Sequence, residues 1–377
     1  MWDMREKTYS KERGYSYVDY PRILWIYYEW GSHPVFVPLA TALGADRFAI
    51  REPNEKSLYR KIPVLNHLID YVRWLYLAFK LPKDYDAFLI DTGLGYQAAA
   101  VAKKLHLLKN TKIIVWCAWA GFSREFAKKT SKFFITNKLL KEVDIFLSPS
   151  KYRETKINEV VKDKKIIIVY GFPNPRIKPF LEENNVSPEL NLHRLLTIPG
   201  NLTSRSHIET KGVDLVLEAF QSVKQKYADA TLSIVGYGLS DKGLLNLIKT
   251  NGVTFIEHPN DSSLANLIKR SSLYVHIGRD DAFPTSALDA MYGGLPVLVS
   301  DQTGTIDVME ELDPRLVTSL HPKKIAEKID WYFSLSEDER KTLSSRAKGI
   351  SLKFDEGLIA KKFKEDIIGT LTGGQAK

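Results

Sequence analysis

Short apolar runs alternate with amphipathic stretches along most of the chain. In the first half, each run of strand length is followed by turn residues and then by apolar positions at helical spacing. Strands are predicted at residues 22–28, 86–91, 112–118, 144–148 and 165–170, helices at 34–43 and 97–108, and a turn at 29–34. Strands that alternate with helices are typical of a parallel sheet with helices on both faces.

The same pattern restarts after a polar stretch. Residues 178–192 have little periodicity and are predicted to be a linker. Beyond them, strands are predicted at 194–198, 230–235, 252–256, 273–277 and 296–300, and helices at 212–226, 264–270, near 322–349 and near 355–371. The pattern therefore predicts a tail (1–18), an α/β domain (19–177), the linker, a second α/β domain (193–350) and a C-terminal segment (351–377). Ligands bind at the carboxyl ends of strands in such sheets, so a site is expected between the domains.

The densest chemical signal lies in the segment that leads to the strand at 296–300. Asp281 and Asp289 stand there with seven residues between them, on either side of a Phe-Pro turn. Thr285 or Ser286 is predicted to cap the following helix and to leave backbone N–H groups for phosphate or sugar oxygens. The alternative interpretation is structural, with the aspartates as caps and Gly293-Gly294 as a helix-to-strand turn.

The order of these features resembles the Glu-(seven residues)-Glu signature of the retaining glycosyltransferases of family 4, also called glycosyltransferases group 1. Aspartate replaces both glutamates here. The resemblance implies the GT-B architecture, an α/β fold with two Rossmann-like doubly wound domains that face a cleft. It also implies that the helix in 351–377 crosses back to the N-terminal domain. The implied activity is transfer of a sugar, of the hexosyl type, from a nucleotide-diphosphate sugar to a lipid-linked or glycan acceptor.

Residue roles follow from the resemblance at matching positions. Asp281 would bind donor-sugar hydroxyls near the reacting carbon, and Asp289 would hold the ribose. Lys211 matches the family lysine on the donor diphosphate. Asn201 stands where an arginine is usual, and Arg205 is expected to supply the missing guanidinium. A fixed Lys and Arg would stabilise the leaving diphosphate electrostatically, so neither an essential metal nor a cofactor beyond the nucleotide sugar is expected.

Further donor contacts are implied on both sides of the cleft. They would come from loops at the strand ends, namely Gly31, Ser32, Gly200, Asn201, Gly236, His258, Phe283, Pro284, Thr285 and Ser286. His33 has no assigned role, and the histidine usual after the strand at 112–118 is replaced by Cys117-Ala-Trp. No general base is evident, so the leaving phosphate is expected to accept the acceptor's proton.

The charge of the chain is unevenly distributed. Residues 1–180 hold 31 Lys and Arg against 18 Asp and Glu (+13), whereas residues 181–377 hold 23 against 27 (−4). Segments 60–80 and 124–141 combine basic with apolar or aromatic residues, which suits an anionic membrane surface. The alternative is core packing of the first segment and solvated lysines on the second. No run of eighteen uncharged apolar residues or apolar signal core is present, so a cytoplasmic protein, peripheral on the inner face of the membrane, is expected.

Other functional classes use related folds. A nucleotide-sugar epimerase or a DNA-modifying glucosyltransferase would share the architecture, but the chain has no recognition helix or zinc module, so nucleic acid is not an expected partner. A non-catalytic partner subunit, in which the aspartates mark lost activity, is the third alternative.

Overall fold

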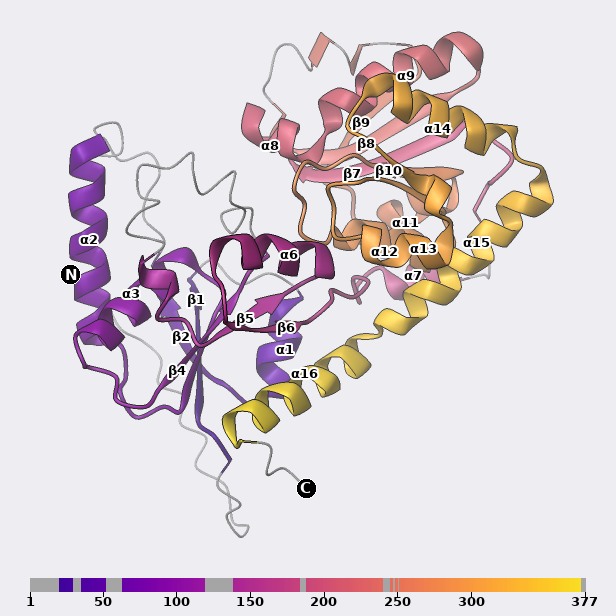
Figure 1. Cartoon of the computed structure of the whole chain (residues 1–377). Coiled ribbons are helices and arrows are strands. Elements are labelled where there is room, and N and C mark those ends of the chain that lie inside the picture. The colour runs from indigo at the N-terminus through magenta and orange to yellow at the C-terminus, as the bar shows by residue number, and fades with distance from the viewer. Residues whose placement is uncertain are drawn as a thin grey trace.

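The computed structural model describes residues 20–29, 35–51, 63–118, 138–183, 188–239, 245–246, 248–249 and 251–373, and for 63–67 the backbone alone. Within them, two parallel sheets of six strands each form the centres of two domains (Figure 1). The strand orders are β2-β1-β3-β4-β5-β6 and β12-β11-β10-β7-β8-β9. Both orders require crossover connections between parallel neighbours, and the helices that make them cover the faces of each sheet.

The first sheet consists of β1 (Ile23–Tyr28), β2 (Asp46–Ile50), β3 (Ala87–Ile90), β4 (Lys112–Trp116), β5 (Ile145–Ser148) and β6 (Lys165–Ile168). Its helices are α1 (Phe36–Ala42), α2 (Pro63–Lys80), α3 (Gly93–Lys104) and α6 (Lys151–Val160). Every residue of β3 and β5 is buried, as expected for strands covered on both faces. The sequence pattern did not predict β2, because this edge strand is largely exposed and its sequence is polar at the start.

The helix predicted at 97–108 starts four residues earlier. α3 begins at Gly93 because the Thr92 hydroxyl accepts the N–H of Gly95 and caps the helix. A side chain at Gly95 would place its Cβ 2.5 Å from that hydroxyl oxygen. The glycine therefore permits the first helical turn to sit tightly on the end of β3.

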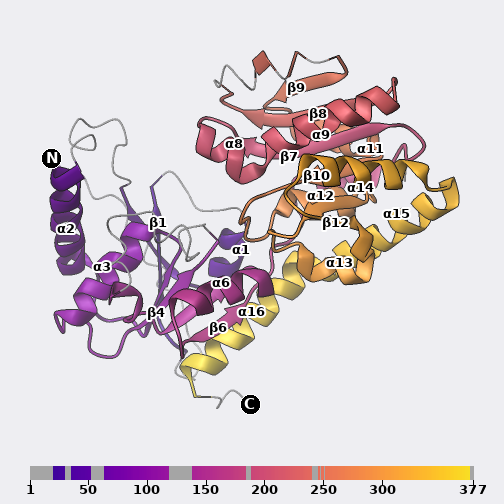
Figure 2. The same cartoon turned by 45° about the horizontal axis from the view of Figure 1, so that its top comes forward.

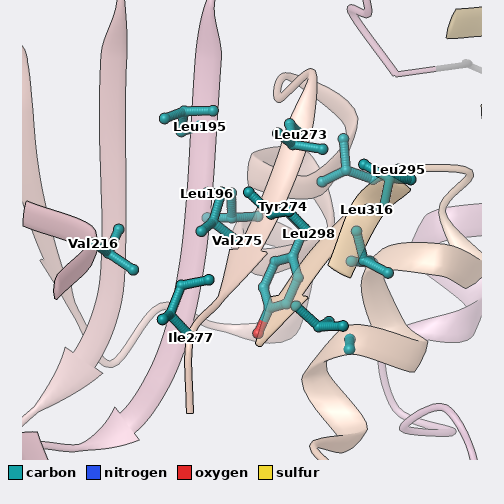
Figure 3. Packing of buried hydrophobic residues seen from close by; sticks show 14 of the residues in the cluster. Leu195, Leu196, Val216, Leu273, Tyr274, Val275, Ile277, Leu295, Leu298 and Leu316 are labelled. Atoms are coloured by element: carbon teal, nitrogen blue, oxygen red, sulfur yellow. The ribbon is translucent and has the colours of Figure 1, made fainter. Parts of the chain in front are cut away.

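The second sheet consists of β7 (Arg194–Asn201), β8 (Thr231–Tyr237), β9 (Val253–Glu257), β10 (Leu273–His276), β11 (Val297–Ser300) and β12 (Val317–Thr318). Its helices are α7 (Lys178–Glu182), α8 (Arg205–Lys211), α9 (Val213–Lys226), α11 (Asp261–Lys269), α12 (Thr285–Tyr292), α13 (Ile306–Leu312), α14 (Pro322–Ser334) and α15 (Glu337–Ser351). Figure 3 shows buried side chains of β7, β10 and β11 packed together with Val216 of α9 and with Leu316.

Two predicted irregular segments contain regular structure. No regular structure was expected between the strand predicted at 194–198 and the helix predicted at 212–226, but β7 continues to Asn201 across a bulge between Thr197 and Gly200. Arg205–Lys211 then form α8, whose N-terminus is capped by the Ser204 hydroxyl. In the predicted linker, residues 178–182 form α7.

The last helix returns to the first domain. α15 leads through a 3₁₀ turn, Leu352–Phe354, into α16 (Glu356–Leu371), which packs against α1. Phe363 and Ile367 of α16 are buried in the same cluster as Phe36 and Leu39. Figures 1 and 2 show this yellow segment running along one side of both domains. The core of the first sheet is therefore completed by the end of the chain.

The helices are all short or polar by the standard of a bilayer. Within the described part of the chain, none has the length and apolar composition that crossing a membrane requires.

Candidate functional site

A pocket of about 460 Å³ lies between the two domains. The first domain lines it with Val35, Trp116, Ala118, Pro149 and Gly171. The second domain contributes Ile198, Pro199, Gly200, Lys211, Asp281, Ala282, Phe283, Pro284, Thr285, Ser286 and Asp289. Several of these residues end or directly follow a strand, so the pocket lies at the carboxyl ends of the parallel strands, where such sheets bind ligands.

The side chains of Lys211 and His276 both contact the carboxylate of Asp281. The Lys211 ammonium lies 2.7 Å from Asp281 Oδ2, and His276 Nε2 lies 3.0 Å from the same oxygen. Burial would raise the pKa of Asp281, but the charge of Lys211 and the hydrogen bond from His276 outweigh it and hold the pKa well below its usual range. Asp281 is therefore ionised at neutral pH.

Sequence reasoning missed His276. It is the last residue of β10 and is 1% exposed. The available signal was its polarity within an otherwise apolar strand, five residues before Asp281. A buried histidine in that position needs a hydrogen-bond partner, and the nearby carboxylate provides one.

The backbone around Asp281 is held from both domains. Asp280 has a positive φ of 63°, and its carbonyl accepts a 2.7 Å hydrogen bond from Arg153 of α6 in the first domain. The N–H of Asp281 donates to Gln302, and its carbonyl accepts from the N–H of Gly304. The position of the reactive carboxylate therefore depends on fixed backbone contacts as well as on its ion pair.

Asp307 of α13 fastens the start of α6 to the second domain. Its carboxylate accepts the backbone N–H groups of Lys151 at 2.6 Å and Tyr152 at 3.3 Å. Ser150 donates its hydroxyl to the carbonyl of Ala282 at 2.6 Å. A carboxylate at a helix N-terminus is favourable, and here it comes from the opposite domain. These contacts fix the first domain against the loop that carries Asp281.

Asp289 lies one helical turn inside α12 and is buried, at 7% exposure. Its carboxylate accepts the backbone N–H of Asn174, in the segment that follows the first sheet, at 2.7 Å. Burial raises the pKa of Asp289 to about 7. Both aspartates line the pocket, but only Asp281 has a cation in contact with its carboxylate among the described residues.

The predicted cap of α12 is wrong. Thr285 and Ser286 are the first residues of the helix, the N-cap position is Pro284, and no side chain caps the helix. Proline has no side-chain oxygen, and the Ser286 hydroxyl instead pairs with Tyr274 at 2.7 Å. The backbone donors of the first helical turn consequently have no side-chain acceptor where the helix meets the pocket.

Four predicted site residues are not among the described residues that line the pocket. Arg205 pairs with Glu209 on the half-exposed surface of α8. Asn201 accepts the N–H and the hydroxyl of Thr203. The ring of His258 stacks on Tyr237, with centroids 5.1 Å apart.

Gly236 is the fourth. A Cβ at Gly236 would lie 2.6 Å from the carbonyl oxygen of Gly200 on the neighbouring strand, so this glycine allows β7 and β8 to approach. Gly31 and Ser32, with the neighbouring His33, lie outside the described residues. Among the described residues, no group of three or more His, Cys, Asp or Glu side chains is arranged to hold a metal ion.

The second domain is similar to known proteins. Residues 202–349, which include Lys211, Asp281 and Asp289, match the family model of glycosyl transferases group 1. A Haemophilus influenzae relative, described as an uncharacterized glycosyltransferase, is 28% identical over 170 residues, which are 44% of this chain and 46% of the relative. The chain thus aligns with less than half the length of this relative. The residues that match the family model therefore include the charged residues of the pocket.

Solved structures resemble the whole chain. A UDP-forming α,α-trehalose-phosphate synthase from Burkholderia xenovorans has a TM-score of 0.70 at 12% identity, covering 95% of this chain and 100% of that chain. HepE from Anabaena, solved in complex with UDP and glucose, has a TM-score of 0.61 at 14% identity, covering 92% and 99%. These similarities, with the two parallel sheets, confirm the predicted GT-B architecture.

Proposed function

Because residues 202–349 match the family model of glycosyl transferases group 1, we propose that this chain transfers a sugar from a nucleotide-diphosphate sugar to an acceptor. The observation that carries the proposal is the convergence of Lys211, Asp281 and Asp289 on one pocket beside the uncapped start of α12. A cation and a helix N-terminus without a side-chain cap suit a diphosphate, and carboxylates suit sugar hydroxyls. The comparisons do not favour any of the three alternatives, which are an epimerase, a DNA-modifying glucosyltransferase and a non-catalytic subunit.

A ligand screen tests this proposal. Nucleoside diphosphates and their sugars that bind the native state should raise the melting temperature in a thermal-shift panel. The sugar nucleotide that gives the largest shift is then incubated with the protein, and release of the nucleoside diphosphate is measured by chromatography. A folded protein that binds no member of the panel and releases no nucleoside diphosphate would overturn the proposed activity.

We further propose that transfer retains the anomeric configuration and needs no divalent metal. On the first-domain wall, the described lining residues Val35, Trp116, Ala118, Pro149 and Gly171 have no ionisable side chain. The leaving diphosphate is then the base nearest to an acceptor hydroxyl on that side, and Lys211 supplies the charge that stabilises it. NMR of the product's anomeric proton distinguishes retention from inversion, and an assay in excess chelator tests the metal requirement.

Replacing Asp289 with alanine should weaken donor binding by about 1–3 kcal/mol, the range for a lost hydrogen bond to a charged group. The pKa of Asp289 is raised to about 7 by burial, and the ionised form is the better acceptor for ribose hydroxyls. Donor affinity of the wild type should therefore rise with pH through about 7. Titration calorimetry at several pH values measures both effects.

The matched control for that experiment is Asp289→Asn. Asparagine keeps an oxygen for the N–H of Asn174 but does not titrate, so its donor affinity should be lower and independent of pH over this range. A folded Asp289→Ala protein with wild-type affinity for the nucleotide would contradict the ribose-binding role.

We also propose that the first domain rests on an anionic membrane, which would give access to a lipid-linked acceptor. The outward face of α2 supports this with an apolar stripe, defined as Leu68, Val72, Leu75, Tyr76 and Phe79, whose members are 46% to 59% exposed. Figures 1 and 2 show α2 at the outer edge of the first domain. Its opposite face is buried at Asp70, Trp74 and Ala78, so the stripe is additional to the face that packs on the domain, and an exposed apolar patch of this kind marks an interaction site.

Charge favours a membrane over a second copy as that partner. Residues 1–180 carry a net charge of +13, so pairing two copies through this half would bring like charges together. An anionic bilayer meets both the apolar stripe and the positive charge, and Lys80 lies over the Tyr76 ring at the end of the stripe. Of the second segment predicted to contact the membrane (124–141), residues 124–137 lie outside the described residues, including Lys128, Lys129, Lys132 and Phe133–Ile135.

Replacing Leu68, Leu75 and Phe79 with glutamine should abolish the part of vesicle binding that persists at high salt, because that part depends on apolar insertion. Cosedimentation with phosphatidylglycerol-containing vesicles, and with phosphatidylcholine vesicles alone, measures it. The matched control is Leu352→Gln with Leu358→Gln, two equally exposed leucines outside the stripe. Equal recovery of wild type and triple variant would reject the membrane contact, and a dimer that dissociates in the triple variant would assign the stripe to a second copy.

A further inference from the structure

Lys211 and His276, the two partners of Asp281, both contact the same one of its two carboxylate oxygens. Lys211 and His276 contact Oδ2 at 2.7 and 3.0 Å, and no described residue donates to Oδ1. Asp281 lines the pocket, so Oδ1 is the oxygen available to a ligand. The orientation of this free oxygen is therefore set by the two side chains that hold Oδ2.

The contact between His276 and Asp281 is built into the local backbone. A Cβ on Gly278 would lie 2.8 Å from His276 Nε2 and 3.0 Å from the Asp281 Cβ, so any side chain at residue 278 would separate the pair. His276 Nδ1 is buried without a hydrogen-bond partner among the described residues. The imidazole therefore makes one hydrogen bond, and a proton on Nε2 is donated to Asp281.

Lys211 has two possible anionic partners once a donor is bound. Its ammonium can pair with the carboxylate of Asp281, as in this structure, or with the diphosphate. The diphosphate carries more charge than a carboxylate, so it will draw the ammonium away from Oδ2. Asp281 has only 11% of its side chain exposed, and it would then be a buried carboxylate with one remaining donor.

We propose that His276 is a positioning residue that keeps Asp281 oriented toward the donor sugar when the diphosphate engages Lys211. This inference rests on the proposed function and adds to it a residue whose side chain, among the described residues, hydrogen-bonds to Asp281 alone. The imidazole is buried and is not among the described residues that line the pocket, so it would act on a bound donor indirectly, through its hydrogen bond to Asp281.

The test compares His276→Leu with His276→Gln. Leucine removes the donor, and kcat/KM for the sugar nucleotide should fall about 10- to 100-fold, the range for a hydrogen bond to a charged group. Glutamine offers an N–H in its place and should recover activity to within about threefold of the wild type. The Kd of the free nucleoside diphosphate, which lacks the sugar that Asp281 holds, should stay within about twofold in both variants.

A pH profile separates positioning from a general loss of structure. His276 and Lys211 both lower the pKa of Asp281, so His276→Leu should move the acid limb of kcat/KM to higher pH when it is measured in the Asp289→Asn background, where the carboxyl group with a pKa of about 7 is absent. A purely structural role would lower the melting temperature without moving that limb. If His276→Leu does not fold, Gly278→Ala gives an independent test. Its Cβ would push His276 and Asp281 apart without replacing either residue.

The outcomes distinguish this inference from the proposed function. A wild-type protein that binds no sugar nucleotide removes the proposed function and the inference with it. An active wild type with an unchanged kcat/KM and acid limb in His276→Leu overturns the positioning role alone. Equal impairment of His276→Leu and His276→Gln also overturns it, because the donated N–H would then not be the property that matters.

Discussion

Replacing Lys211 with alanine should lower kcat/KM for the sugar nucleotide by about 100- to 1000-fold, the loss typical of one preorganised donor at a developing negative charge. The substitution removes the cation expected at the diphosphate and also leaves the Asp281 carboxylate, 2.7 Å away, without its ion pair. The ammonium is well placed because Lys211 ends α8 beside Gly212, whose φ of 66° is rarely adopted by other residues. Steady-state kinetics in excess chelator measure the loss.

Arg205→Ala should be measured beside Lys211→Ala, because it tests whether Arg205 also binds the diphosphate. Arg205 was predicted from the sequence to act with Lys211, whereas its guanidinium pairs with Glu209 on α8. A large loss in Arg205→Ala would support the predicted role at the diphosphate, and full activity would remove it. Wild-type activity in Lys211→Ala would reject Lys211 as the diphosphate ligand.

Replacing Arg153 with methionine should lower the free energy of unfolding by about 3–5 kcal/mol, the cost of removing one partner of a buried ion pair. Arg153 is fully buried in α6 of the first domain, donates to the carbonyl of Asp280, and lies 3.4 Å from its carboxylate. Methionine fills similar volume but leaves the carboxylate of Asp280 buried without its charge partner. Urea unfolding followed by circular dichroism measures the change in stability.

Two variants make that experiment specific. Arg153→Met combined with Asp280→Asn removes both charges and should recover part of the lost stability, because no unpaired charge stays buried. Lys362→Met breaks an exposed pair with Asp366 at helical spacing and should change stability by no more than about 0.5 kcal/mol. If Arg153→Met were as stable as Lys362→Met, the domain contact would not depend on this ion pair.

The features that could be predicted from the sequence are those that depend on short continuous segments, such as apolar runs and motifs. The strands at 86–91 and 144–148 were predicted to within two residues, because complete burial requires uninterrupted apolar runs. Lys211, Asp281 and Asp289 were identified because each belongs to a short motif, and the structure brings all three to one pocket.

What the sequence did not predict depends on distant contacts. Arg153 reaches Asp280 across 127 positions, and Asp307 reaches the start of α6 across 156. In the sequence, both look like ordinary surface charges on amphipathic helices. The same limit applies to Arg205, since a basic residue in a predicted loop is free to reach a ligand, whereas in α8 its direction is fixed by the helix.

The return of α16 to the first domain means that the polypeptide crosses between the domains twice, once near Asn174 and once between α15 and α16. A single crossing would act as a swivel, whereas two crossings define one hinge axis and restrict the domains to opening and closing about it. Asp289 binds the backbone at the first crossing through the N–H of Asn174. A ligand that binds Asp289 would therefore contact the segment that joins the domains. Ligand binding in the pocket would then be coupled to the relative orientation of the two domains.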